Sequence, residues 1–337
     1  MDIKKRVLET DGALSPELLK RRMGYSEETQ VLADTAVHPD DEESIQNPGE
    51  KGDSSVYIAG KVGELAQGVD NHGAWLVAGT VSASPFGGGG FASSGGPLRL
   101  TGSGGNGLQK TRLAVNRFLE VSGIKPEEAG RVHLVRNTPV GKGLGSSSVD
   151  AALGIMAVAH ANGVPAHPAT IYQILCSVER SDPCWMASDL VFARPEAGVY
   201  EVWGAQPDFL LVAWDTAPGG TVDTQQAAAF DGLRCKYLSE YAEILQLIRT
   251  RRTPDLLRAA TWSATINNRY LPKPFFDETV RLAASLDVGV LCAHSGTYLG
   301  LLLPRDASPA LLGRVRREIS GLGFIPHFFF MGYGNDE

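Results

Sequence analysis

The chain has 337 residues, enough for about two domains and for a core that needs no disulfide staples. With 43% hydrophobic residues, 20% charged residues and 39 glycines, its composition is that of a globular protein rich in turns, which excludes collagen and coiled coil. The net charge is −7 at neutral pH, but residues 1–55 hold 13 acidic and 7 basic side chains, so the remainder is nearly neutral. Because nucleic-acid binding needs a broad basic surface, we expect no nucleic acid among the partners.

The four cysteines, Cys176, Cys184, Cys235 and Cys292, form no C-x-x-C pair and have no histidine at metal-ligand spacing. This spacing argues against both a zinc site and a disulfide framework. No window approaches 18 continuous apolar residues, and the start of the chain leads into a polar stretch without an apolar signal region. We therefore expect a cytoplasmic protein with no membrane partner.

The expected elements of the first half begin after a weakly ordered acidic tail, residues 1–55, in which Ser15–Met23 is a candidate short helix. The tail is either a docking arm or a solvated extension. Strands are predicted at Val56–Ala59, Trp75–Ser82, Leu98–Thr101 and His133–Asn137, and helices at Leu108–Val121, Val149–Ala161 and Pro168–Arg180. The glycine-rich segment Pro85–Pro97 is predicted to be a mobile hairpin loop.

The second half continues to alternate strands and helices. Strands are predicted at Val199–Trp203, Phe209–Trp214, Val288–Ala293, Leu299–Leu303 and Phe324–Phe330, and helices at Leu238–Arg249, Pro254–Asn267, Pro274–Leu286 and Pro309–Ser320. This alternation predicts an α+β protein of two layered units that divide near residues 190–205.

The segment Asn137–Ser148, N-T-P-V-G-K-G-L-G-S-S-S, lies between an expected strand and an apolar helix. Its alternating glycines let backbone N–H groups approach a ligand, and the positive end of the helix dipole points to the same place. Phosphate is therefore the expected ligand. The spacing is not that of the common P-loop. A glycine and serine turn that only caps a core helix is the alternative.

Two further segments share this glycine-rich character. Ala59–Gly68 reads A-G-K-V-G-E-L-A-Q-G, and Ala293–Gly300 reads A-H-S-G-T-Y-L-G. With the P-x-x-x-G-L-G-S-S pattern that begins at Pro139, they resemble in order the three motifs of the GHMP kinases, the superfamily of galactokinase, homoserine kinase, mevalonate kinase and phosphomevalonate kinase. Ser148 replaces the usual alanine, and the resemblance covers roughly residues 56–330.

The resemblance implies the GHMP kinase fold. It implies an N-terminal ribosomal-protein-S5-like domain that binds ATP over residues 56–195 and a C-terminal ferredoxin-like domain over residues 196–337, with residues 1–55 outside both. ATP and Mg²⁺ are the implied cofactors, and a small hydroxylated metabolite is the implied substrate. The resemblance leaves a homodimer open.

Within the superfamily the chain looks most like the L-threonine kinases that supply the aminopropanol phosphate arm of cobalamin. Those proteins carry G-E-L-x-Q-G, matched by Gly63–Gly68, and A-H-S-G-[ST], matched by Ala293–Thr297. Val178–Pro183 resembles their E-x-[ST]-D segment. Lys61 departs from them, because they have a small residue there, and is similar to mevalonate kinase instead. The resemblance therefore implies L-threonine as the acceptor, with homoserine, another amino alcohol or a mevalonate-like acid as alternatives.

The site residues follow from these matches. Asp182 would accept the proton of the acceptor hydroxyl or orient that hydroxyl, and Ser147 and Glu179 would hold Mg²⁺. Pro139, Gly141, Lys142, Gly143, Leu144, Gly145, Ser146, Ser147 and Ser148 would form the ATP loop. Lys61, Glu64, Gln67, His294, Ser295, Gly296 and Thr297 would bind the acceptor, and the Glu64 carboxylate offers a partner for its ammonium group. Taken without the resemblance, Glu179 and Asp182 are typical of a solvated helix end.

Two competing functions remain at this point. Gly102–Gly107 matches G-x-G-x-x-G after a strand and before a helix, as in dinucleotide-binding proteins, but no series of parallel βαβ units surrounds it. A GHMP-fold sensor that binds nucleotide and metabolite without turnover is the second alternative. Ser147, Glu179 and Asp182 favour an enzyme, because a sensor does not need metal ligands or a base.

Overall fold

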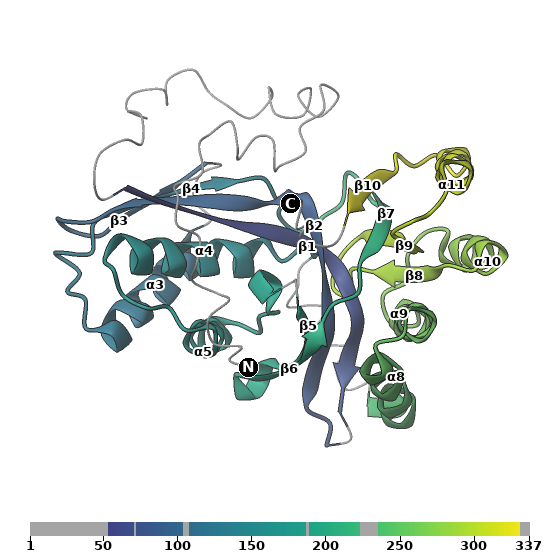
Figure 1. Ribbon diagram of the computed structural model, residues 1–337, viewed down its shortest axis with the longest axis horizontal. Helices are drawn as coiled ribbons and strands as arrows, with labels where there is room; N and C mark the ends of the chain where they lie inside the picture. Colours follow the sequence, from purple (N-terminus) through teal and green to yellow (C-terminus); the bar gives the residue numbers. More distant parts are fainter. Residues whose placement is uncertain (1–52, 71, 104–107, 187–188, 223–234, 331–337) are drawn as a thin grey trace.

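The structure of the protein, a computed structural model, describes residues 53–70, 72–103, 108–186, 189–222 and 235–330 (Figure 1). The acidic tail up to residue 52, with its candidate helix at Ser15–Met23, lies outside the described residues. So does most of the G-x-G-x-x-G segment, at residues 104–107.

Two sheets form the framework. The first has six strands, β1 (Asp53–Val69), β2 (Trp75–Ser93), β3 (Arg99–Gly102), β4 (Arg131–Arg136), β5 (Asp189–Arg194) and β6 (Val199–Ala205). They follow the order β3-β4-β2-β5-β6, with β1 paired to β2. The second sheet has four strands, β7 (Phe209–Asp215), β8 (Gly289–Cys292), β9 (Tyr298–Pro304) and β10 (His327–Phe330), in the order β10-β7-β9-β8. Helices cover both sheets, as the α+β expectation requires.

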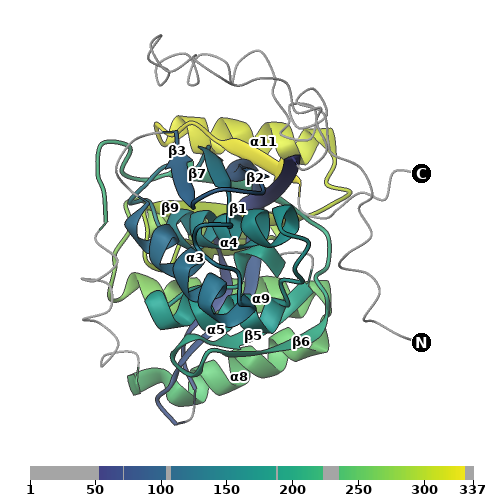
Figure 2. The same cartoon turned by 90° about the vertical axis from the view of Figure 1, so that its left-hand side faces the viewer.

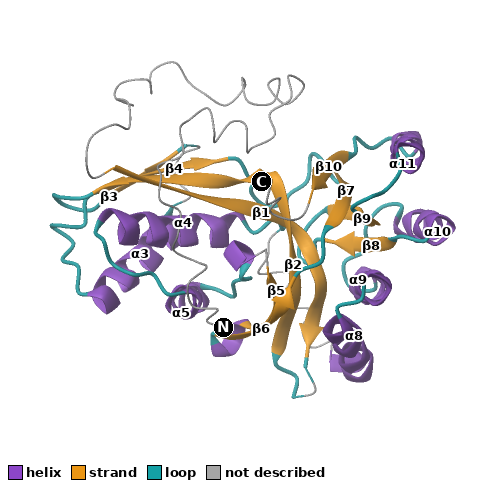
Figure 3. Cartoon of the chain, viewed as in Figure 1, coloured by secondary structure: helices purple, strands orange, loops and turns teal. Residues whose placement is uncertain are grey.

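Helices α3 (Gln109–Ser122), α4 (Ser146–Ala161) and α5 (Pro168–Val178) lie on one side of the first sheet (Figures 2 and 3). Helix α4 is buried almost all round, which is typical of a helix in the centre of a core. Three short 3₁₀ turns, η4 (Cys184–Met186), η5 (Pro195–Ala197) and η6 (Cys235–Tyr237), connect the larger elements. No helix among the described residues is long and apolar enough to cross a membrane.

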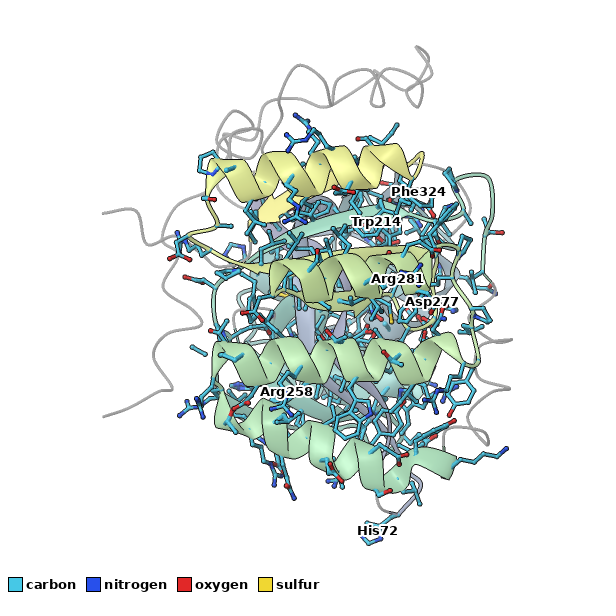
Figure 4. All side chains as sticks on the ribbon, turned by 90° about the vertical axis from the view of Figure 1, so that its right-hand side faces the viewer. His72, Trp214, Arg258, Asp277, Arg281 and Phe324 are labelled. Carbon is cyan, nitrogen blue, oxygen red and sulfur yellow. The ribbon has the colours of Figure 1, made fainter. Side chains whose placement is uncertain are left out.

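Helices α8 (Leu238–Thr250), α9 (Thr253–Asn268), α10 (Phe276–Leu286) and α11 (Pro309–Gly321) lie side by side as an outer layer (Figure 4). Trp214 of β7 is fully buried beneath this layer, and its ring stacks on Phe324 at 6.3 Å between centroids. Helices α8 and α9 also pack against β1. The long first strand therefore contacts helices that follow it by almost 200 residues.

Strands β1 and β2 are much longer than the sequence predicts. The predicted end of the first strand at Ala59 was wrong, because β1 continues through the motif Ala59–Gly68 to Val69 and pairs with β2 along this length. Register shifts at Ala59/Gly60 and Lys61/Gly63 interrupt the ladder. Such bulges re-aim side chains, here just where the first motif begins.

The prediction of a mobile loop over Pro85–Pro97 was also wrong, because Gly87–Gly90 is a strand paired on both edges, with β1 and with β4. A Cβ at Gly88 would come within 3.0 Å of Leu153 on α4, and one at Gly90 within 3.2 Å of Ala157. The glycines therefore let α4 pack directly on the sheet backbone. Strand β5 was missed, whereas the remaining elements lie within a few residues of their predicted positions.

Candidate active site

The segment between β4 and α4 has the backbone that its glycines predict. Gly141, Gly143 and Gly145 have φ of +74°, +74° and +71°, which is the left-handed region where a side chain is strained. Gly145 is the N-cap of α4, so the free N–H groups of the first helical turn begin at Ser146. Ser146 and Ser147 are half-buried in that turn, which is the geometry of an anion site.

This loop packs directly on the loop of the third motif. The N–H of Thr297 donates to the carbonyl oxygen of Lys142 at 3.2 Å. A Cβ on Gly296 would overlap this carbonyl, and one on Gly143 would lie 2.5 Å from the Cα of Gly296. The two glycine-rich motifs are therefore in contact, backbone against backbone.

The ammonium group of Lys142 is bound by other groups of the protein. Its Nζ lies 2.6 Å from the Oδ2 of Asp215 and donates to the carbonyls of Ala217 at 2.6 Å and Pro218 at 3.0 Å. Only 8% of the residue is exposed. This side chain ties the loop after β4 to the end of β7.

A buried cluster of charged side chains adjoins the loop. Lys61 of β1 forms ion pairs with the Oε1 of Glu64 and the Oδ2 of Asp182, which follows α5. A Cβ on Gly145 would lie 3.1 Å from the Cε of Lys61, so the lysine stem runs beneath the start of α4. Lys61 and Glu64 are 2% and 1% exposed. The structure thus brings together three predicted site residues that are up to 121 positions apart.

His294, directly after β8, extends this cluster. Its Nδ1 lies 2.9 Å from the Oε2 of Glu64, and its Nε2 lies 2.8 Å from the hydroxyl of Ser263 on α9. Asn267, one turn further along α9, donates from Nδ2 to the carbonyl of His294 at 2.8 Å. The sequence interpretation missed Ser263 and Asn267. The sequence does contain a pattern that could have identified them, because they are two polar residues four positions apart on an otherwise apolar helix face.

Charge pairing sets the proton affinities of the cluster. Burial alone would lower the pKa of Lys61, but Asp182 and Glu64 outweigh it and hold that pKa above its usual value. Burial alone would raise the pKa of Glu64, but Lys61 and His294 lower it to about 2. Burial raises the pKa of Asp182, and the nearby Glu64 adds to this effect, against the attraction of Lys61.

His294 is a separate case because its pKa lies near neutrality. Burial would lower this pKa, but Cys292 and then Glu64 raise it to about 8. At pH 7 the ring is therefore mostly protonated, with both nitrogens donating. Its partners, Glu64 and Ser263, both have oxygens that accept these hydrogen bonds.

The predicted metal ligands supply hard oxygen atoms of the kind that Mg²⁺ prefers. Ser147 lies in the first turn of α4, and Glu179 is the C-cap of α5, three residues before Asp182. The Glu179 carboxylate forms an ion pair with Lys110 of α3, and its side chain is 24% exposed. No group of three or more histidine, cysteine or acidic side chains that could hold a metal occurs among the described residues. The donor set suits a cation that keeps water and phosphate oxygens as its other ligands.

The remaining predicted residues divide into buried and open positions. Leu144, Ser148, Gly296 and Thr297 are buried in the packing of the two loops, whereas Pro139 is exposed and Ser295 is half-buried. Gln67 is 4% exposed, its backbone N–H donates to Ser263, and its Oε1 has no hydrogen-bond partner among the described residues.

Comparison with known proteins agrees with this arrangement. Residues 109–192 match the family model described as GHMP kinases N terminal domain. The structure superposes on galactokinase from Lactococcus lactis with a TM-score of 0.62 and 13% identity, over 84% of this chain and 94% of that one. The chain therefore has the GHMP kinase fold, and its residues 109–192 are similar to the N-terminal domain of those kinases.

Two sequence relatives are named L-threonine kinases. The chain is 32% identical over 181 residues to an L-threonine kinase of Citrobacter freundii, over 52% of this chain and 63% of that protein. It is 29% identical over 183 residues to an L-threonine kinase of Salmonella typhimurium strain LT2, over 52% and 60% respectively. In each case the match spans less than two thirds of the relative.

Proposed function

We propose that this protein is an ATP-dependent kinase that phosphorylates the hydroxyl group of a small metabolite, and that this metabolite is L-threonine. The observation that carries the proposal is the buried Lys61–Asp182 pair directly beside the glycine loop at the start of α4. Phosphoryl transfer needs this combination of a phosphate cradle, compensating positive charge and an oriented acceptor.

The residues divide this work as follows. Backbone N–H groups around Gly143, Gly145 and Ser146 would bind the phosphates of ATP. Asp182 would accept the proton of the acceptor hydroxyl while that oxygen attacks the γ-phosphorus and the bond to ADP breaks. A pKa above the usual aspartate value suits this role, because a base works best when its pKa approaches the operating pH.

Lys61 would keep Asp182 ionised until the transfer and would balance charge on the phosphoryl group. Ser147 and Glu179 would hold Mg²⁺, which neutralises the phosphates when it is bound. Since the Glu179 carboxylate pairs with Lys110 here, metal binding would compete with that pair. The sequence match to L-threonine kinases supports the acceptor, together with the Gly63–Gly68 and Ala293–Thr297 motifs.

Glu64, which the sequence predicts to bind the acceptor, has a second role in this proposal. Both of its carboxylate oxygens already have partners, Lys61 and His294, so an acceptor ammonium would share one of them. We infer that Glu64 chiefly positions these two cations. The ammonium group of the acceptor would then be recognised by the combined negative charge of Glu64 and Asp182.

ADP release with L-threonine, its deamino analogue, L-serine, L-homoserine and mevalonate at equal concentration tests this function, with the product phosphate located by NMR. L-Threonine should be the preferred acceptor, and its deamino analogue should lose roughly two orders of magnitude in kcat/KM. If mevalonate were turned over faster than every amino acid, the acceptor would be a mevalonate-like acid, as the similarity of Lys61 to mevalonate kinase indicates. Binding of ATP and threonine without ADP release would make the protein a sensor.

A further inference from the structure

We propose that Ser263 is a positioning residue for phosphoryl transfer, acting from helix α9 through His294 and Glu64 on the Lys61–Asp182 pair. The proposal rests on the kinase function proposed above. It concerns a residue that neither the glycine motifs nor the acid–base chemistry identifies.

The contacts form one continuous buried path. The Ser263 hydroxyl meets His294 Nε2 at 2.8 Å, and His294 Nδ1 meets Glu64 Oε2 at 2.9 Å. Glu64 then uses its other oxygen to pair with Lys61, which pairs in turn with Asp182. Ser263 is 0% exposed and His294 is 1% exposed, so water does not replace these partners freely. The path joins the outer helix layer to the segment after α5.

Helix α9 also holds the backbone carbonyl of His294, and Ser263 itself is held by β1. Asn267 donates to the His294 carbonyl and accepts from Lys273 Nζ at 3.2 Å. The backbone N–H of Gln67 on β1 donates to the Ser263 hydroxyl at 3.3 Å. Helix α9 therefore holds both the ring and the main chain of His294, which leaves the imidazole little freedom to turn.

A hydroxyl group is suited to this place because it both donates and accepts. When His294 is protonated, its Nε2–H donates to the Ser263 oxygen. When His294 is neutral and keeps its proton on Nδ1 for Glu64, the serine donates to Nε2 instead. Ser263 thus keeps the ring in one orientation in both charge states, with the stronger bond to the charged ring.

Charge balance links this ring to the reaction. Lys61 faces two carboxylates, Glu64 and Asp182, and the single positive charge of the lysine neutralises only one of their two negative charges. A protonated His294 compensates Glu64 and leaves Lys61 to Asp182. Besides Glu64 and Lys61 on β1, the charged or titratable groups around His294 are Cys292 at the end of β8 and Lys273 between α9 and α10. Without the His294 proton, Glu64 would draw Lys61 away from Asp182. Lys61 would then hold Asp182 and balance the charge of the phosphoryl group less well, so kcat should fall as the pH rises above about 8.

The experiment compares Ser263→Ala and Ser263→Cys with wild type, using His294 titration followed by ¹⁵N-histidine NMR and kcat followed against pH. Resonances of His294 are identified with His294→Gln. In Ser263→Ala the charged ring loses its acceptor, so the pKa of His294 should fall by about half to one pH unit. The pH at which kcat falls on the alkaline side of its profile, the alkaline limb, should be lower by the same amount. The KM for ATP should be unchanged. Ser263→Cys keeps the shape of the side chain but replaces the hydroxyl with a poorer hydrogen-bond acceptor. It should therefore shift the His294 pKa and the alkaline limb less than Ser263→Ala does.

Thr265→Ala is the matched control, because Thr265 lies on the same helix and its hydroxyl bonds only to the carbonyl of Thr261 among the described contacts. It should leave the His294 pKa and the alkaline limb at their wild-type positions. An unchanged His294 pKa in Ser263→Ala, or a limb that stays in place while the pKa moves, would overturn the proposal. The NMR titration needs no acceptor, so it decides the role of Ser263 even if no kinase activity is found.

Discussion

Lys61 and Asp182 form a largely buried ion pair although they lie 121 positions apart, Lys61 in the hairpin of β1 and β2 and Asp182 after helix α5. The register shift of β1 between Lys61 and Gly63 also lets Glu64 pair with Lys61, because residues three positions apart in a regular strand point to opposite faces. The same lysine passes beneath Gly145, so one side chain connects the first motif, the phosphate loop and the proposed base.

Lys61→Met should destabilise the fold strongly. The variant leaves Glu64 and Asp182 as neighbouring buried carboxylates without their shared cation, and breaking such a pair costs about 3–5 kcal/mol. Lys110→Met is the matched control, since Lys110 pairs with Glu179 from a half-exposed position and such pairs contribute about 0–1 kcal/mol. Urea unfolding measures both values. Equal losses in the two variants would contradict the burial argument.

Asp182→Asn should separate chemistry from binding. The amide keeps the shape of the side chain but cannot accept the acceptor proton, so kcat should fall by roughly two to four orders of magnitude. Calorimetric titration should show an ATP affinity close to wild type, because the phosphate loop is unchanged. Near-wild-type turnover in this variant would mean that Asp182 is not the base and that it at most orients the acceptor.

The sequence allowed the fold class and most element positions to be predicted, because the apolar periodicities of helices such as α10 and α11 are strong. It failed for the long hairpin, since Gly60, Gly63 and the run Gly87–Gly90 are typical of loops when read locally. The close approach of α4 to β2 explains the need for glycine at Gly88 and Gly90, whereas a Cβ at Gly63 would overlap the carbonyl of Cys292.

Part of the candidate site could likewise be predicted from the sequence, and part could not. Glycine motifs identify backbone positions, and they pointed to the phosphate loop and the loop after β8. They do not show that Lys142 bonds within the protein or that Ser263 reaches His294, because both contacts join elements distant in sequence. Such contacts follow from tertiary packing and leave no local pattern.

Gly296→Ala should disrupt the contact between the two glycine loops. The added methyl group overlaps the Lys142 carbonyl, which cannot move without shifting the loop that holds Gly143. We expect a loss of roughly 1–3 kcal/mol in stability and weaker ATP binding. Gly219→Ala is the control, because a Cβ there meets nothing within 4 Å and its φ is not in the left-handed region. Thermal unfolding and ATP titration of both variants test this, and wild-type ATP affinity in Gly296→Ala would contradict it.

The part of the stability that depends on His294 should fall as the pH rises from about 6.5 to about 8. The pKa of His294 is raised from 6.5 to about 8 in the folded state, so folding favours the protonated ring. A group of this kind contributes its full stabilisation below the unfolded pKa and loses it as the pH rises through the folded pKa. The gap between the two values corresponds to about 2 kcal/mol at 1.36 kcal/mol per pH unit. Urea unfolding at pH 6, 7, 8 and 9 measures the slope, and His294→Gln, which cannot take up a proton, should lose this pH-dependent part. An equal slope in wild type and His294→Gln would show that another group is responsible.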